Sequence, residues 1–330
     1  MSRFPLSALA ALLMTTMAAT SAGAQAPDPI AYTIRFPAPA THYMEVEAVY
    51  PTAGRPEIDL FMAVWTPGSY LIREYQRHVE QVAARGAGGQ SLAVAKTTKN
   101  RWRVSTGGAS TVTVSYRVYG REMTVRNNWI EAGFAMLNGA PTFLTLVERG
   151  PRPHRVRLEL PAGWTRTATA LTPVAGQPHT FVAEDFDTLV DSPIIAGNPV
   201  VTEFAVDGKA HYVVHEGDPS LWDTARANDD VRKIVEVTRD FWGGDLPYPY
   251  YYVLNMVTEA GGGLEHKNST LLMANRFATR TRRPYLNWLN LVSHEFFHVW
   301  NVKRLRPLAL GPFDYENENY TESLWVAEGT

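Results

Sequence analysis

Residues 112–118 read Val-Thr-Val-Ser-Tyr-Arg-Val, and this stretch decides the class of fold. Its apolar residues, at 112, 114, 116 and 118, alternate with polar ones, so they share one face of an extended chain. Residues 44–50 repeat the alternation, with Glu45 and Glu47 on the polar face, and residues 155–160 repeat it again. Clusters of Gly, Pro and Asn separate such runs. The pattern predicts antiparallel sheet and a β-sandwich-like domain over residues 25–200.

The composition limits both the size and the chemistry of the protein. A chain of 330 residues exceeds one typical domain of about 100–200 residues, which predicts two domains. The 31 basic and 33 acidic residues give a net charge of −2, so we expect no nucleic-acid partner, and no interior run is apolar enough for a stable membrane span. Because cysteine is absent, any metal must be held by His, Asp or Glu.

The first residues have the pattern of a targeting signal. An uncharged stretch, residues 4–24, follows Arg3, has its apolar centre at residues 9–14, and ends in Ala22-Gly23-Ala24. This pattern predicts a signal peptide over residues 1–24 and an exported protein, either periplasmic or secreted. A retained membrane anchor is the alternative, but the apolar centre is short for about 30 Å of hydrocarbon.

The pattern changes after Asn198-Pro199. Two strand-like runs, 201–206 and 210–214, flank Asp207-Gly208, which predicts a hairpin. A helical pattern follows over residues 231–238, with Gly243-Gly244 as its stop, and then an apolar run of strand length at 250–257. These elements begin a second domain over residues 201–330, and the whole chain is predicted to be α+β.

Residues 294–298 read His-Glu-Phe-Phe-His, inside an apolar pattern at 285–305 that indicates a largely buried helix. Residues four apart stand one turn above each other, so His294 and His298 can bind one ion while Glu295 faces a bound water. This is the geometry of a zinc peptidase site. The alternative is two hydrogen-bonded histidines in a core.

Two histidines need a third protein ligand, with a fourth position left open for water and substrate. Residues 321–329 have helical spacing after a Thr or Ser cap, so Glu328 can project from a second helix. Glu328 is preferred because Leu324 and Trp325 lie about one turn before it and indicate a buried face, where a carboxylate needs a partner. The other candidates are Glu316, Glu318 and Glu322, of which Glu322 is better explained by the helix dipole.

Three glycines, Gly261, Gly262 and Gly263, follow the apolar strand and precede Glu265. Glycine lets another backbone approach closely, and Glu265 can meet a positively charged amine, so these four residues are predicted to bind substrate. A glycine hairpin with a solvated Glu265 is the alternative.

Three separated motifs resemble the glycyl aminopeptidase family of gluzincin metallopeptidases. They are Gly-Gly-Gly-Leu-Glu-His at 261–266, His-Glu-Phe-Phe-His-Val-Trp-Asn-Val-Lys-Arg-Leu-Arg-Pro at 294–307 and Leu-Trp-Val-Ala-Glu-Gly at 324–329. Trp-Thr-Pro-Gly-Ser-Tyr at 65–70 extends the resemblance over the mature chain.

The resemblance implies an N-terminal β domain and a thermolysin-like catalytic domain. It also implies one zinc ion at His294, His298 and Glu328, with Glu295 as general base and Glu265 at the substrate amine. Family members continue into a helical subdomain and a PDZ domain, so we expect the chain to be a fragment that is weakly active or inactive by itself. The resemblance also implies that the oxyanion-stabilising tyrosine or histidine lies beyond Thr330. The spacing of Tyr315 and Tyr320 recommends neither as that donor.

The predicted function is a zinc-dependent aminopeptidase acting on peptides with small N-terminal residues such as Gly or Ala. Attack on the scissile bond by zinc-bound water, assisted by Glu295, is the predicted mechanism. Without an amine contact at Glu265, the same centre would run as a thermolysin-like endopeptidase. The alternative of another class is a non-catalytic exported peptide-binding protein, which has no use for Glu295. Oligomeric state cannot be read from these patterns.

Overall fold

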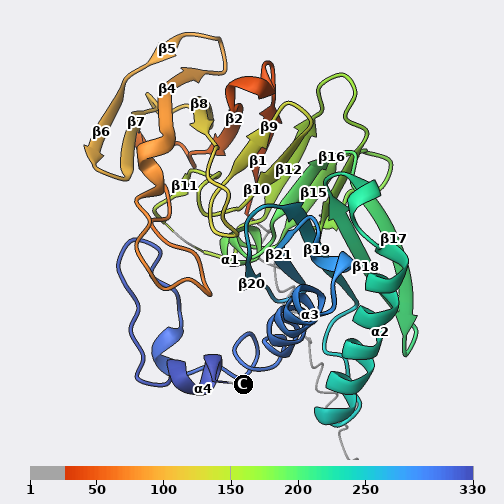
Figure 1. Ribbon diagram of the computed structural model, residues 1–330. Coiled ribbons are helices and arrows are strands. Elements are labelled where there is room, and N and C mark those ends of the chain that lie inside the picture. Colours follow the sequence, from red (N-terminus) through yellow and green to blue (C-terminus); the bar gives the residue numbers. More distant parts are fainter. Residues whose placement is uncertain (1–26, 149, 330) are drawn as a thin grey trace, which may run out of the picture.

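A large, mostly antiparallel sheet dominates the N-terminal half of the protein, shown as a computed structural model in Figure 1. The structure describes residues 27–148 and 150–329, so the predicted signal peptide lies outside the described residues. In spatial order the eight strands are β14 (Thr172–Pro173), β15 (Thr180–Ala183), β12 (His154–Glu159), β1 (Ile30–Arg35), β2 (Tyr43–Pro51), β8 (Thr111–Tyr119), β4 (Val79–Gly86) and β5 (Ser91–Leu92). The apolar face of β8 is buried as the alternation predicted, with Val114 and Val118 0% exposed.

Two four-stranded sheets complete the N-terminal half. One runs β13 (Arg166–Thr169), β16 (Ile194–Gly197), β10 (Phe134–Leu137), β9 (Trp129–Glu131), and the other runs β11 (Thr145–Leu146), β3 (Glu57–Phe61), β7 (Arg101–Ser105), β6 (Val94–Thr98). A single apolar core joins side chains from these sheets, and aromatic rings such as Tyr32, Tyr50 and Phe143 pack at its centre. The predicted α+β class with an N-terminal antiparallel β domain is confirmed.

The second half is built on a five-stranded mixed sheet. Its order is β17 (Val200–Val206), β18 (Lys209–Glu216), β19 (Tyr250–Thr258), β21 (Ser269–Asn275), β20 (Gly262–Glu265). The predicted hairpin is present between β17 and β18, where Asp207 and Gly208 have φ of 51° and 74°. Positive φ at both central residues is typical of a type I′ turn, whose backbone twist matches that of the flanking strands. Strands β18, β19 and β21 are parallel, and β20 runs antiparallel at the edge.

Two long helices cover one face of this sheet, α2 (Thr224–Phe241) and α3 (Arg282–Phe297). The predicted helical face is confirmed in α2, where Val231, Val235 and Thr238 are buried. From α3, Trp288 and Phe296 enter the same core. In Figure 1, α2 lies at the lower right beside β17 and β18, and α3 lies to its left.

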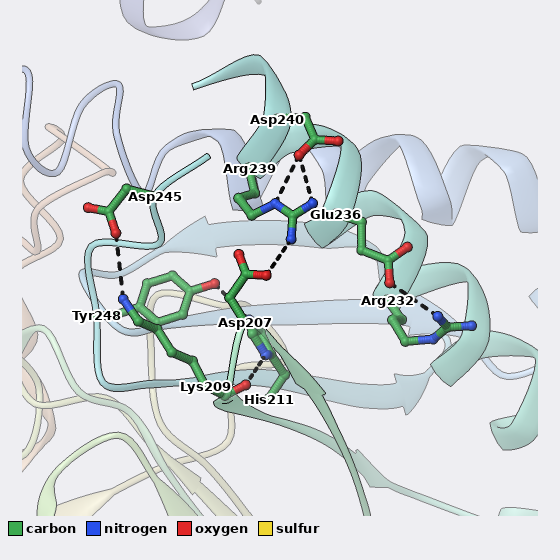
Figure 2. A network of polar contacts seen from close by, with 9 residues as sticks. All are labelled: Asp207, Lys209, His211, Arg232, Glu236, Arg239, Asp240, Asp245 and Tyr248. Atoms are coloured by element: carbon green, nitrogen blue, oxygen red, sulfur yellow. Dashed lines mark hydrogen bonds and ion pairs between the residues drawn. The ribbon is translucent and has the colours of Figure 1, made fainter. Parts of the chain in front are cut away.

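A polar network joins the C-terminal end of α2 to the β17–β18 hairpin, as Figure 2 shows. Arg239 of α2 donates to Asp207 at 2.8 Å, and Lys209 lies 3.7 Å from Asp245. Nearby, Nε2 of His211 lies 2.7 Å from the Tyr248 hydroxyl. Burial lowers the pKa of His211 to about 4, so this ring stays neutral. The network thus connects α2 and the segment after it to the edge hairpin of the five-stranded sheet.

Two areas of apolar packing are among the contacts between the halves of the chain. The small sheet containing β10 and β16 packs on the five-stranded sheet, where Met136 and Ile195 meet Leu254 and Met273. The segment after α3 returns to the N-terminal half, and its Tyr315 is 0% exposed in the first core. The remaining helices are short: α1 (Phe186–Val190) and α4 (Leu324–Glu328). Within residues 27–148 and 150–329, no helix combines the length and apolarity needed to cross a membrane.

Candidate metal centre

The two histidines lie at the C-terminal end of α3, which ends earlier than the apolar pattern at 285–305 indicated. The helix stops at Phe297, and His298 is its C-cap. Beyond it the backbone forms wider turns, in which the Lys303 amide donates to the His298 carbonyl at 3.0 Å. The Arg304 guanidinium donates to the carbonyl of Val299 and so offers that carbonyl an alternative to a helical bond.

Three side chains converge at this helix end. Nε2 of His294 lies 3.1 Å from Nε2 of His298, and Oε2 of Glu328 lies 3.4 Å and 3.6 Å from those two nitrogens. Tetrahedral zinc with bonds of about 2.0–2.2 Å places neighbouring donors about 3.3–3.5 Å apart. The three donors therefore fit one zinc ion in spacing and in chemistry.

The neighbourhood of His298 sets which of its nitrogens would face a bound ion. Its Nδ1 lies 2.7 Å from the carbonyl oxygen of Asn301, and a carbonyl can only accept, so Nδ1 carries the hydrogen. In the neutral ring this leaves the Nε2 lone pair toward His294 and Glu328. A backbone acceptor of this kind orients a metal-binding imidazole.

The contacts among these three side chains shift the pKa values of Glu328 and His298. Hydrogen bonds from His294 and His298 lower the pKa of Glu328 to about 2. Burial lowers the pKa of His298, but the Glu328 hydrogen bond and the Glu265 charge outweigh it and raise the value to about 9. A metal cation would displace the His298 proton, so metal affinity falls as pH falls.

Glu328 lies beside the histidines, but the prediction of a buried helical face before it was wrong. Trp325 is 77% exposed, so no buried face of α4 precedes Glu328. Ala327 is the residue of α4 that is buried, and Ser323 at the N-cap makes no side-chain cap bond. The tie to the helix end is the Asn301 side-chain amide, which donates to the Val326 carbonyl at 3.0 Å.

The rival carboxylates lie elsewhere. Glu316 accepts two bonds of 2.7 Å from the Arg101 guanidinium in the N-terminal half. Glu318 and Glu322 are exposed, and Glu318 accepts from the Tyr320 hydroxyl. None of the three belongs to the clusters of candidate ligands found among the described residues.

Glu295 is a residue of α3, and its side chain points toward Gly263 of the edge strand β20. Its side chain is 5% exposed, and a Cβ atom at Gly263 would lie 2.1 Å from its Oε1. The space beside Gly263 is thus filled by Glu295, whereas we expected it to admit another backbone. Burial and the charge of Glu265 raise the pKa of Glu295 to about 7, which suits a group that takes and returns a proton near neutral pH.

Glu265, the last residue of β20, is 3% exposed, which excludes the solvated hairpin carboxylate. Its Oε1 has no hydrogen-bond partner among residues 27–148 and 150–329. Glu265, Glu295 and His298 bring donor atoms within 4.8 Å of one another, so a second acidic cluster adjoins the first and shares His298 with it. Gly261 and Gly262 lie at the start of this edge strand, with Gly261 exposed.

Two contributors from the N-terminal half were not identified from the sequence. Gly68, with φ +90°, lies so close that a Cβ atom on it would be 2.6 Å from both Glu265 oxygens. Tyr70 follows with φ 49°, a strained value for a residue with a side chain, and its pKa is raised by burial and by the charges of Glu265 and Glu328. In the sequence, residues 65–70 stood out through the family resemblance alone, and no pattern indicated their contact with Glu265.

The two tyrosines considered in the sequence do not face the cluster. Tyr315 is buried in the N-terminal core, and its hydroxyl donates to Asp187 at 2.8 Å. Tyr320 is 74% exposed. The expectation that an oxyanion donor lies beyond Thr330 stays a prediction.

Comparisons with known proteins match both halves of the chain. The family profile described as Peptidase M61 N-terminal domain matches residues 31–198, and the one described as M61 glycyl aminopeptidase matches residues 287–330. No curated protein matches the sequence.

Comparison with solved structures finds a similar fold in an aminopeptidase N family protein from Idiomarina loihiensis. It is 33% identical, with a TM-score of 0.85 over 91% of this chain and 52% of its own length. An M1 zinc metallopeptidase from Deinococcus radiodurans is 15% identical, with a TM-score of 0.49 over 84% of this chain and 64% of its own. The chain thus spans about half the length of the Idiomarina loihiensis protein.

Proposed function

The chain belongs to the M61 glycyl aminopeptidase family, and we propose that it is part of a zinc-dependent aminopeptidase. The proposed substrates are peptides with small N-terminal residues. Membership of the family confirms the resemblance seen in the sequence and supports a peptidase activity. The metal, the roles of individual residues and the substrate preference are our proposal.

His294, His298 and Glu328 would hold one zinc ion, as their spacing of 3.1–3.6 Å supports. When bound, zinc supplies a Lewis acid that lowers the pKa of water and polarises the scissile carbonyl. Asn301 holds the His298 ring in the tautomer that leaves Nε2 available. The chain thereby presents two imidazoles and one carboxylate and leaves a fourth position for water and substrate.

Glu295 is the proposed general base. It accepts a proton from the attacking water at a carboxylate oxygen and delivers it to the nitrogen of the leaving amine. Its position beside His294 on α3, and its burial against Gly263, hold the carboxylate next to the metal ligands. A non-catalytic peptide-binding protein has no use for a buried proton acceptor at this place.

The single observation that carries the aminopeptidase proposal is the buried, unpartnered Oε1 of Glu265. Burying a carboxylate oxygen without a partner is costly, so the site calls for a donor or a cation from outside the described residues. The terminal ammonium of a peptide supplies both charge and hydrogen bonds. A fixed separation between this anchor and the metal would direct cleavage to the first peptide bond.

The turn at 65–70 supports a preference for small N-terminal residues. Gly68 packs against both Glu265 oxygens, and Tyr70 lies near Glu265 and Glu328. An ammonium at Glu265 would therefore have its first side chain against this turn. Gly or Ala needs the least space there.

A groove of about 350 Å³ supports the path of the remaining peptide. It lies between the β20 edge and α3, where Gly261, Gly262, Trp288 and Leu291 line it. An extended peptide can add to such an edge through backbone hydrogen bonds. Export of the protein, to the periplasm or the medium, is a further part of the proposal and rests on residues 1–24 alone.

Matched peptides with free and acetylated N-termini test the aminopeptidase proposal on the full-length protein. We expect the free peptide to be cleaved at least about 30-fold faster, because removing one partner of a buried charge pair costs about 2–5 kcal/mol and each 1.36 kcal/mol is tenfold in rate. Glu265→Gln should lose most of this preference while retaining zinc. Equal cleavage of both peptides by the unmodified protein would favour the endopeptidase instead.

A further inference from the structure

Asp191, at the C-terminal end of α1 in the N-terminal half, contacts three groups of the second half. Its Oδ1 accepts from Lys303 Nζ at 2.7 Å and lies 3.1 Å from Nδ1 of His266, while its Oδ2 accepts from the Lys267 backbone amide at 2.8 Å. No pattern in the sequence singled out this carboxylate.

These contacts are largely withdrawn from water. The side chains of His266, Lys303 and Asp191 are 1%, 9% and 16% exposed. Burial opposes ionisation of Asp191, but Lys303 and His266 outweigh it and hold the pKa of Asp191 far below its usual range. The carboxylate is therefore charged at every pH at which the protein would work, and its bonds are charge-assisted.

The partners of Asp191 lie directly beside the proposed machinery on two separate elements. His266 and Lys267 are the two residues after Glu265 at the end of β20. Lys303 follows α3, and its backbone amide donates to the carbonyl of His298 at 3.0 Å. One carboxylate thus fixes the end of the amine-anchoring strand and the turn that carries a proposed metal ligand.

We propose that Asp191 is a positioning residue that sets the separation between Glu265 and the metal centre, and that it thereby restricts cleavage to peptides with a free N-terminus. This inference rests on the proposed function. It also gives the N-terminal β domain a role in the reaction, because exopeptidase selectivity would depend on a residue more than 70 positions before Glu265 in the chain.

A second ion pair between the halves provides a matched control. Glu316 and Arg101 form a two-pronged contact, with both distances 2.7 Å and Glu316 13% exposed. It involves none of the residues next to Glu265 or His298. Glu316→Gln removes a comparable contact between the halves without touching the anchor.

Asp191→Asn in the full-length protein tests the inference, with Asp191→Glu as the charge-preserving variant. We expect the ratio of kcat/KM for free over acetylated peptides to fall at least about tenfold in Asp191→Asn, mainly through KM of the free peptide. Asp191→Glu should recover part of the ratio, and Glu316→Gln should keep all of it. Zinc content and Tm should be similar in Asp191→Asn and Glu316→Gln.

Binding gives a readout that does not depend on turnover. In a zinc-loaded Glu295→Gln background, calorimetry should show that Asp191→Asn weakens binding of the free dipeptide Gly-Gly and leaves that of its acetylated form unchanged. If Asp191→Asn does not fold, Lys303→Gln removes one of the three contacts and carries the same expectation.

An unchanged ratio in a folded Asp191→Asn would overturn the inference while leaving the proposed function intact. An equal loss in Glu316→Gln would also overturn it, because general loosening of the two halves would then be the cause. Equal cleavage of both peptides by the unmodified protein is a different result, which contradicts the proposed function itself.

Discussion

Of the three proposed metal ligands, Glu328 lies on the shorter helix, α4, which has fewer buried residues than α3. α4 has five residues, lacks a side-chain cap bond and exposes Trp325. The Glu328 carboxylate is 44% exposed and is held mainly by its contacts with His294 and His298. Its place in the site follows from the segment that leads to α4 and not from a buried helical face.

Replacing Glu328 with Ala should weaken zinc retention by at least about 10²-fold, because even outer partners of metal ligands account for about 10–100-fold. Chelator titration of the full-length protein measures this directly. Glu322→Ala is the control, since Glu322 is exposed and lies outside the clusters of candidate ligands among the described residues. Loss of metal in Glu322→Ala instead would show that the ligand set is wrong.

At the scale of elements, the contact between β20 and α3 places the proposed base. Register pairs Gly263 with Leu272 of β21, and the face of Gly263 that lacks a side chain receives Glu295 of α3. A strand residue of any other type would occupy the volume of that carboxylate. Glycine is therefore required here by close approach of a helix side chain.

Gly263→Ala should displace the Glu295 side chain and lower kcat by about 10²-fold or more, as for loss of a positioned general base, with zinc retained. Gly133→Ala is the control, because nothing in the described part of the chain lies within 4 Å of a Cβ there and Gly133 lies outside the site. Zinc content, Tm and kcat should be measured on both variants. Normal turnover in a folded, zinc-loaded Gly263→Ala would contradict the assignment of Glu295.

At the scale of the whole molecule, the segment between α3 and α4 connects the metal centre to the N-terminal core. The Tyr315 carbonyl accepts from the Val64 amide at 2.8 Å, and the Asp314 carbonyl accepts from Nε1 of Trp65 at 2.7 Å. The Tyr315 ring is fully buried and stacks with Trp65. The position of α4, and of Glu328 with it, thus depends on packing against the N-terminal half.

Tyr315→Ala should lower the free energy of unfolding by about 3–5 kcal/mol, as for loss of a buried aromatic side chain, and should also weaken zinc retention. Tyr315→Phe keeps the ring and loses only the bond to Asp187, so it should cost about 1 kcal/mol and retain zinc. Denaturant unfolding and chelator titration measure the two effects. A destabilised Tyr315→Ala with normal zinc affinity would show that α4 is positioned independently.

The sequence by itself determined the features that depend on neighbours along the chain. Alternation gave the strands β2 and β8, spacing gave the buried face of α2, and Asp207-Gly208 gave its hairpin, because backbone geometry alone decides which residues share a face. The spacing of His294 and His298 is likewise a property of one helix. These patterns predict the α+β class and the histidine pair without any information on tertiary contacts.

Tertiary structure decided the rest. The burial of Glu265, the approach of Gly68, the bonds of Asp191 and the placing of Glu328 each join residues from different elements, most of them far apart in sequence. Local periodicity carries no information about such pairs. They depend on how the two halves pack. Glu265, for which solvation was the alternative in the sequence, is buried where Gly68 of the first half packs against it, and its Oε1 has no partner among the described residues.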